Sequence, residues 1–382
     1  MVQSKVIWRA LPALVSVVLV PFRLEAQTVQ AGPVEFRFGG RIQMQFSTTS
    51  LDRSDIPGGG SVDPADLEIR RLRASVEARL GDRLKGKVEP DFTSRDATLR
   101  DAWVDVAFAD GFALRAGQFK KPFSRLESTS SVLIVPIERG VRIRGLRSAL
   151  EAATEPVTGR PLFGEAGGSP VLGDGYALLD GLGYLGRDVG LAAHGRLGRV
   201  AYEVGVFNGR GTSVRPGQEG LAAAGRLVVR PAPGLPLSIG AGASYRKSRF
   251  DDTDALRRRG GAAFEVDAEW GEFRRPGVHV VVEGAVGSNP AVDATLVGAQ
   301  GIVAYFAPLA WRPIEGIEPL VRVGYGDPDT GRRGDQGWLL TPGVNVYLPG
   351  KNRLMLNWDL YVAGAGRPRS ASAVRAQAQV AL

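Results

Sequence analysis

Apolar and polar side chains alternate along most of this chain. In residues 34–47, Val34 and Phe36 alternate with Glu35 and Arg37, and the alternation continues to the end of the stretch. A period of two residues is typical of a β-strand with one apolar and one polar face. Fifteen further stretches repeat the pattern, so we predict sixteen strands. They lie near residues 34–48, 66–80, 83–93, 97–109, 111–118, 187–197, 199–207, 220–230, 235–247, 260–270, 275–287, 293–307, 313–326, 336–347, 351–364 and 371–382.

One predicted strand changes phase in its middle. In residues 66–80, Leu72 begins a run of apolar side chains on one face, whereas Leu67 and Ile69 have the opposite parity. A single extra residue in one strand of a pair produces such a change. We therefore predict a β-bulge near Arg70–Arg71.

The connections between the predicted strands alternate in length. Most connections after even-numbered strands are short, such as Gly81-Asp82 and Pro349-Gly350, and most after odd-numbered strands are long and polar, such as 49–65 and 327–335. The exceptions are the short connections Thr93–Asp96 and Ser288–Val292. Outer-membrane barrels combine an even strand number with short periplasmic turns and longer external loops. The sequence therefore predicts an all-β fold, a transmembrane antiparallel β-barrel of sixteen strands with its long loops outside.

The first 26 residues follow a different pattern. Lys5 and Arg9 precede an apolar run from Leu11 to Val20, and Leu24-Glu25-Ala26 then forms a plausible cleavage site. These are the features of a secretory signal peptide. An uncleaved membrane anchor is the alternative, but the run is shorter than the ~20 residues that a spanning helix needs. We predict a signal peptide over residues 1–26 and the barrel over residues 27–382.

The longest connection, residues 119–186, follows the fifth predicted strand. Pro122 has no N–H for a sheet ladder, so the strand must end just before it. The segment that follows is rich in basic residues and contains an apolar block, Val132–Ile137. A long irregular segment is usually functional or disordered, and the apolar block argues against disorder because it can be buried. We expect a basic loop that folds back into the barrel and constricts it.

Composition narrows the possible chemistry. The chain has 382 residues, no cysteine and only two histidines, His194 and His279, which we interpret as structural because both lie in predicted strands. Thiolate chemistry is excluded, and histidine-based metal or triad chemistry has almost no material. Asp327–Gly331 resembles a calcium loop but lacks its downstream glutamate, so we interpret it as a polar loop. We expect no enzymatic activity, cofactor or metal; the net charge of +8 favours anionic partners.

Four motifs in the first third of the chain resemble those of a known family. They are Gly39–Gln43 (GGRIQ), Leu67–Leu72 (LEIRRL), Leu99–Val104 (LRDAWV) and Leu114–Ser131. In this order and spacing they resemble the phosphate- and polyphosphate-selective porins of the bacterial outer membrane, most strongly over residues 35–131. The resemblance implies a trimeric, sixteen-stranded channel for anions in which a basic external loop folds into the lumen. The chain departs from the family at its C-terminal Leu382, where such barrels usually end in an aromatic residue, and in residues 148–186.

The candidate site is a set of basic side chains in the lumen. Rings of arginine or lysine commonly make pores anion-selective, and the guanidinium of arginine stays charged and binds phosphate in a fork. The residues that we expect to line the pore and bind anions are Arg37, Arg41, Arg70, Arg71, Arg73, Arg79, Arg115, Lys120, Lys121 and Arg125. The alternative is that these charges pair with neighbouring carboxylates and only structure the wall. Acidic residues in the stretch 260–270 could form an opposite wall, which would create a transverse field.

The leading functional hypothesis is a passive outer-membrane porin that prefers anions such as phosphate and polyphosphate. The alternatives are a general porin of weak selectivity, or a barrel that residues 119–186 plug and that has a structural or enzymatic role. We expect the protein to contact outer-membrane lipid and lipopolysaccharide and to form a homotrimer, and we expect no nucleic-acid partner.

Overall fold

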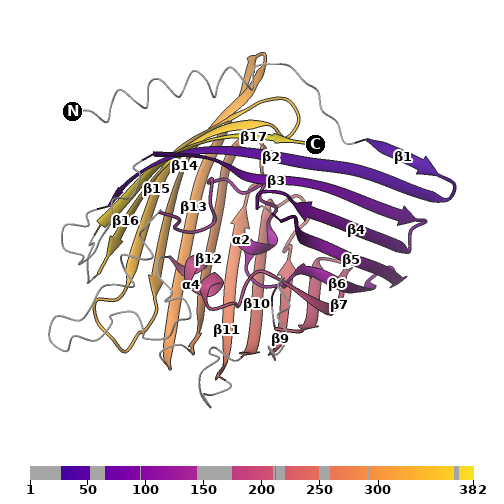
Figure 1. The fold of residues 1–382 in the computed structure, drawn as a ribbon, viewed down its shortest axis with the longest axis horizontal. Helices are drawn as coiled ribbons and strands as arrows, with labels where there is room; N and C mark the ends of the chain where they lie inside the picture. Colours follow the sequence, from indigo (N-terminus) through magenta and orange to yellow (C-terminus); the bar gives the residue numbers. More distant parts are fainter. Residues whose placement is uncertain are drawn as a thin grey trace.

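The computed structural model describes residues 27–51, 65–94, 96–143, 174–209, 211, 220–248, 259–290, 293–364 and 370–382. They form a closed barrel of sixteen antiparallel strands, as the alternation predicted (Figure 1). The strands are β2 (Val34–Leu51), β3 (Ala65–Leu80), β4 (Leu84–Asp91), β5 (Thr98–Ala109), β6 (Phe112–Lys120), β7 (Arg187–Leu197), β8 (Val200–Phe207), β9 (Gly220–Val229), β10 (Leu237–Ser248), β11 (Arg259–Trp270), β12 (Gly277–Asn289), β13 (Ala294–Trp311), β14 (Ile314–Asp327), β15 (Gly337–Tyr347), β16 (Arg353–Ala363) and β17 (Ser370–Ala381). The expected signal peptide, residues 1–26, lies outside the described residues.

The ring closes where the last strand meets the first. β17 pairs with β2, and the other fifteen contacts of the ring join strands that are consecutive in the chain. A short N-terminal strand, β1 (Thr28–Ala31), pairs with β2 beyond the point where β17 ends. There the N–H of Leu382 donates to the carbonyl of Gly40 at 2.9 Å. β1 therefore covers the part of the β2 edge that β17 leaves open.

The two faces of the sheet differ in the way expected for a wall between lipid and water. On β15, Trp338 and Leu340 are about half exposed on the outside, while Leu339 and Thr341 are buried on the inside. Large apolar side chains are exposed on many of the other strands as well, and most of the buried charged side chains face inward. Apolar residues facing outward and polar residues facing inward are typical of membrane barrels. Among the described residues, no helix is long and apolar enough to cross a membrane.

The predicted β-bulge is present in β3. Arg71 lies opposite Gln43 and Ile69 lies opposite Met44, so Arg70 is the extra residue. Successive residues of a regular strand point to opposite faces, and the extra residue cancels that alternation for one step. As a result, Arg70 and Arg71 both reach the same carboxylate inside the barrel, that of Glu138.

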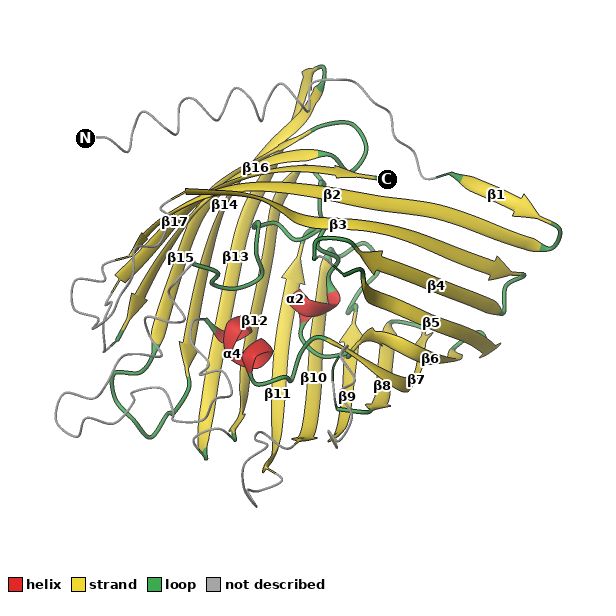
Figure 2. Ribbon diagram, in the orientation of Figure 1, coloured by secondary structure: helices red, strands yellow, loops and turns green. Residues whose placement is uncertain are grey.

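The described part of the long connection lies inside the ring of strands. Figure 2 shows its two short helices, α2 (Arg125–Ser128) and α4 (Gly175–Gly181), within the barrel. Inward-facing side chains from distant strands hold it: Glu265 of β11 accepts from the N–H of Ser124 at 3.1 Å, and Asn357 of β16 accepts from the N–H of Ile137 at 2.7 Å. Residues 121–143 therefore cross the lumen from one wall to another. Residues 144–173 lie outside the described part of the chain.

The apolar block is the part of this loop that packs most closely against the wall. Val132, Ile134, Val135 and Ile137 are buried, and only Leu133 is exposed. Val135 belongs to an apolar cluster whose other members are Leu126, Val281, Ile302, Ala304 and Leu320. Burying such side chains stabilises each by about 1.5–3 kcal/mol, which fastens the loop to β12, β13 and β14.

Helix α4 lies directly on the backbone of β13 and β14. A Cβ atom on Gly175 would lie 2.7 Å from the Cα of Gly298, and one on Gly324 would lie 2.7 Å from the Cβ of Asp174. Asp174 caps the helix by accepting from the N–H of Ala177 at 3.2 Å. Glycine is needed at these contacts because any side chain would hold the helix away from the wall.

Candidate functional site

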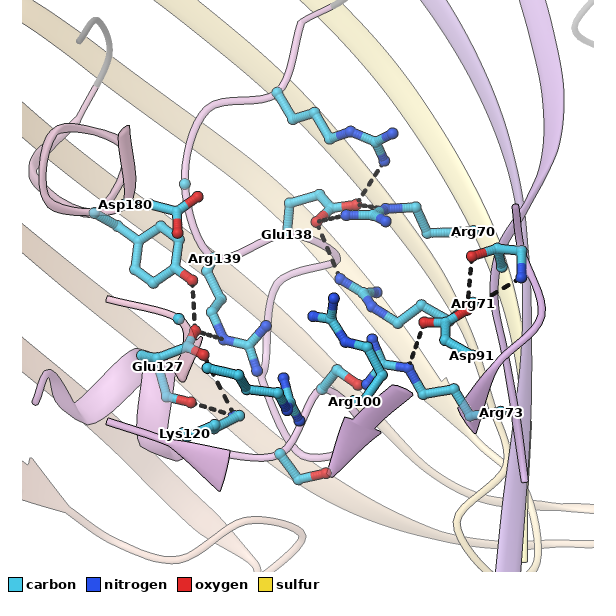
Figure 3. A pocket seen from close by; sticks show the side chains of 18 of the residues that line it. Arg70, Arg71, Arg73, Asp91, Arg100, Lys120, Glu127, Glu138, Arg139 and Asp180 are labelled. Carbon is cyan, nitrogen blue, oxygen red and sulfur yellow. Dashed lines mark hydrogen bonds and ion pairs between the residues drawn. The ribbon is translucent and has the colours of Figure 1, made fainter. Parts of the chain in front are cut away.

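A cavity of about 1060 Å³ lies between the loop and the inner face of β2–β7. We call it the basic cavity, because ten basic and five acidic side chains are among the residues that line it (Figure 3). The basic ones are Arg41, Arg70, Arg71, Arg73, Lys87, Arg100, Lys120, Arg139, Arg142 and Arg187, and the acidic ones are Asp91, Asp101, Glu127, Glu138 and Asp180. Charges of one sign in a confined space raise the local concentration of ions of the opposite sign.

Two arginines stand opposite each other on neighbouring strands of this wall. Arg41 of β2 pairs in register with Arg73 of β3, and like charges in that arrangement repel. The buried carboxylate of Glu89 offsets the repulsion, because it lies 2.7 Å from Arg41 and 3.3 Å from Arg73. Arg73 also pairs with Asp91 at 2.7 Å. Glu89 and Asp91 therefore neutralise part of the positive charge of this wall.

Glu138 joins the loop to this arginine wall. It reaches from the loop between Arg70 and Arg71, and its carboxylate lies 2.5 Å from the first and 3.3 Å from the second (Figure 3). Arg142 approaches it at 3.3 Å. Burial alone would raise the pKa of Glu138, but Arg71 and Arg70 hold that pKa well below its usual value. Glu138 is therefore ionised throughout the neutral range.

A second loop carboxylate, Glu127, organises the other side of the cavity. Arg139 lies 3.7 Å and Lys120 4.0 Å from it, and the hydroxyl of Tyr176 donates to it at 2.7 Å. Burial alone would raise the pKa of Glu127, but Lys120 and Arg139 lower it. Burial and the nearby charge of Glu127 raise the pKa of Asp180 instead. Of these two acids, Asp180 takes up a proton first as the pH falls.

Arg100 differs from the other basic residues of the cavity. Each of the other nine has a carboxylate within 4.0 Å. Within the described chain, Arg100 has no ion pair, and its Nε has no hydrogen-bond partner. Its charge lies near those of Arg73 and Arg187. An arginine whose donors are free in a cavity of excess positive charge can offer them to a passing anion.

A second β-bulge places Arg100 in the cavity. Asp101 lies opposite Glu89 and Leu99 lies opposite Pro90, which leaves Arg100 as the extra residue of β5. Arg100 was not among the predicted site residues, although the motif LRDAWV carries the same change of parity as β3. Leu99 and Val104 are both exposed on the outside but differ in parity, so one residue between them had to be extra.

Five of the ten predicted site residues meet in the basic cavity. They are Arg41, Arg70, Arg71, Arg73 and Lys120. Arg37 and Arg79 are exposed close to each other, where β2 begins and the antiparallel β3 ends, and they do not line it. Arg115 pairs with Asp105 and Glu203 in a separate network.

Two predicted loop residues also lie away from the basic cavity. Lys121 is buried and donates to the carbonyl of Gly183 at 2.5 Å. Burial lowers its pKa to about 8. Arg125 forms an ion pair with Glu269 of β11.

Besides Arg100, the prediction missed Lys87, Arg139, Arg142 and Arg187. Lys87 could have been found from the alternation in residues 83–93. Arg139 and Arg142 were recognised as basic loop residues, but nothing in the sequence indicated which wall they would face. Arg187 begins β7 and pairs with Asp101 at 2.6 Å, a contact between residues 86 positions apart.

A second cavity, of about 360 Å³, lies on the other side of the loop. We call it the apolar cavity, because seven of its thirteen lining residues are apolar. The two cavities share Ser128 and Ser130 as lining residues. Glu269 lies in the wall of the apolar cavity, and its Oε1 accepts a hydrogen bond from His279 Nε2 at 3.0 Å.

The predicted acidic wall on β11 takes a different form. Glu265 and Asp267 are buried and paired with Arg226, and neither lines the basic cavity. In the described part of the chain, no group of three or more histidine, cysteine, aspartate or glutamate side chains is arranged to hold a metal ion.

Comparison with known proteins agrees with this geometry. A family model described as phosphate-selective porin O and P matches residues 36–269. No curated protein matches the chain. The fold resembles that of the outer-membrane channel DcaP of Acinetobacter baumannii (14% identity, 94% of this chain and 100% of that chain, TM-score 0.55).

Two further solved structures share the fold. They are an anion-selective porin from Comamonas acidovorans (12% identity, 91% of this chain and 100% of that chain, TM-score 0.57) and the trimer form of OmpT from Vibrio cholerae (14% identity, 91% of this chain and 99% of that chain, TM-score 0.54). At such identities the likeness establishes the fold alone.

Proposed function

This chain belongs to the family of phosphate-selective porins O and P, and on that premise we propose that it is an anion-preferring diffusion channel whose solutes are phosphate and polyphosphate. That the chain is an outer-membrane porin follows from the family and the closed barrel together. The proposed preference for anions rests on the basic cavity. Its lining carries twice as many basic as acidic side chains.

The observation that carries the proposal is the free guanidinium of Arg100. The other basic residues of the lining are neutralised in part by carboxylates, so an anion must compete for them. Arg100 has no such partner within the described chain. A phosphate entering the cavity can therefore accept its hydrogen bonds without displacing a carboxylate. Lys120 and Arg73 line the same cavity and add to the attraction.

Ion selectivity in planar bilayers tests the proposal. In a KCl gradient, the reversal potential should show that chloride is more permeant than potassium, and added phosphate should lower the chloride conductance. Equal permeabilities and no effect of phosphate would favour the general porin of weak selectivity, in which the ion pairs of the cavity cancel its field.

We also propose the orientation and assembly that the sequence predicted. The protein is exported through a cleaved signal peptide, the connection at residues 327–335 faces outside, and the turn at Gly81-Asp82 faces the periplasm. Asp329→Cys should react with a membrane-impermeant maleimide on intact cells, and Asp82→Cys should not; the reverse result would overturn the orientation. Native mass spectrometry in detergent should show a homotrimer, and only monomer would count against it.

A further inference from the structure

We infer that the channel has a second solute subsite, formed by the apolar cavity, which takes the carbon skeleton of a small organic anion. The inference rests on the proposed anion preference and extends it from inorganic phosphate to phosphate monoesters with an apolar group. Its physical basis is that the loop separates two cavities of opposite character. The basic cavity attracts an anionic group, whereas the apolar cavity offers an apolar surface.

The size and lining of the apolar cavity suit a small organic molecule. Cavities of roughly 300–1,000 Å³ with mostly apolar walls and a few polar groups are the usual form of small-molecule sites. This cavity has a volume of about 360 Å³. Val281 and Ile302 form part of its wall on β12 and β13, Phe273 adds an aromatic ring from the β11–β12 turn, and Leu133 adds the exposed side chain of the apolar block.

The apolar cavity offers no unpaired positive charge to an inorganic anion. Arg125 is paired with Glu269, and the same carboxylate contacts His279. An inorganic phosphate would have to lose hydration there without gaining an unpaired cation, which is costly. An apolar ring, in contrast, is stabilised by leaving water.

The linings of the two cavities share Ser128 and Ser130, and the inference requires that one molecule contacts both cavities there. Arg41 donates to the hydroxyl of Ser130 at 3.3 Å and to that of Ser131 at 3.1 Å, which places a guanidinium of the basic cavity at the boundary. A phosphate monoester can direct its phosphate group toward Arg41 and its apolar group toward Val281. Phenyl phosphate has this chemistry, with a dianionic head and a flat apolar ring.

The test compares phenyl phosphate with inorganic phosphate as inhibitors of the chloride conductance in planar bilayers at pH 8, where both anions are mainly dianionic. The measured quantity is the concentration of each that halves the conductance. Burial of the ring should make this concentration about tenfold lower for phenyl phosphate. If phosphate inhibits but phenyl phosphate inhibits no better, the second subsite is overturned while the proposed function stands. If neither anion lowers the conductance, the proposed function fails as well.

Two neighbouring valines provide a matched control. Val281 faces the apolar cavity, whereas Val282 is exposed on the outside of the barrel. Val281→Thr keeps the shape of the side chain and adds a hydroxyl, so it should reduce the advantage of phenyl phosphate severalfold without changing inhibition by inorganic phosphate. Val282→Thr should change neither. Leu133→Ser, at a partly exposed position that tolerates change, should act like Val281→Thr. Equal behaviour of all three variants would overturn the inference.

Discussion

The arginines on the two sides of this barrel have different surroundings. On β2–β7, arginines face a cavity and outnumber the carboxylates beside them. On β14–β17, Arg322 and Arg375 are almost fully buried under the loop, and both pair with Asp359. Arg322 also donates to the backbone carbonyl of Glu138 at 2.8 Å, so it holds the loop. We propose that the arginines of the basic cavity act on solutes, whereas those that the loop covers stabilise the structure.

The largest expected effect is on the covered side. Asp359→Ala would leave two buried guanidinium groups without their carboxylate, and losing one partner of a buried pair costs about 3–5 kcal/mol. The barrel should lose its heat-resistant gel mobility at a lower temperature, and single-channel records should become noisier as the loop loosens. The control is Glu203→Ala, because Glu203 pairs with Arg115 while remaining partly exposed. An Asp359→Ala barrel as stable as the Glu203→Ala barrel would refute the structural role.

A second prediction compares one arginine from each side. Arg100→Gln should leave the unfolding temperature unchanged, because Arg100 has no ion pair within the described chain, and should raise the phosphate concentration that halves the chloride conductance about fivefold, which corresponds to about 1 kcal/mol. Arg322→Gln should show the opposite result, with lower stability and nearly unchanged inhibition. Bilayer conductance and thermal gel shifts on the same preparations check both. Loss of stability in Arg100→Gln would show that the comparison is wrong.

A third prediction separates two adjacent lysines. Lys120 lines the basic cavity, whereas Lys121 is buried and does not line it. Lys120→Met should shift the reversal potential in a KCl gradient toward cations. Lys121→Met should leave the potential unchanged, since its ammonium faces the carbonyl of Gly183 and not the solute. Equal shifts in the two variants would mean that both lysines act on the pore.

The smallest expected effect concerns pH. The pKa of Asp180 is raised by burial and by Glu127, whereas the pKa values of Glu127 and Glu138 are lowered. As the pH falls, Asp180 should take up a proton before the other two do, so anion preference should rise slightly. Asp180→Asn should show the higher preference already at pH 8 and a flatter profile, measured by reversal potentials. A decrease in anion preference at low pH would contradict this assignment.

The strands of this molecule were predictable from the sequence, because the side chains of a strand alternate between an apolar and a polar face. This alternation located all sixteen strands and the bulge at Arg70. Arg100 was missed, although the change of parity between the apolar residues Leu99 and Val104 indicated an extra residue there. The partners of the loop were not predictable, because Ser124 meets Glu265 and Ile137 meets Asn357 across separations of 141 and 220 residues. No local pattern encodes which of many inward-facing side chains a loop will meet.

The C-terminal part of the long connection shows another limit. The role of its glycines was not predicted from the sequence. Of this stretch, residues 174–186 are described, and they include the capped helix α4. The fit between Gly175 and Gly298 depends on a close approach of two backbones, which a list of small residues does not reveal.

The glycine at 298 sets how closely α4 approaches the wall. Because α4 rests on bare backbone at Gly298 and Gly324, a methyl group there would act as a wedge, displacing the helix inward by roughly the thickness of the added carbon. Tyr176 and Asp180 project from that helix into the basic cavity, so they would move with it. The positions of Tyr176 and Asp180 in the basic cavity therefore depend on two glycines, Gly298 and Gly324, that do not line that cavity themselves.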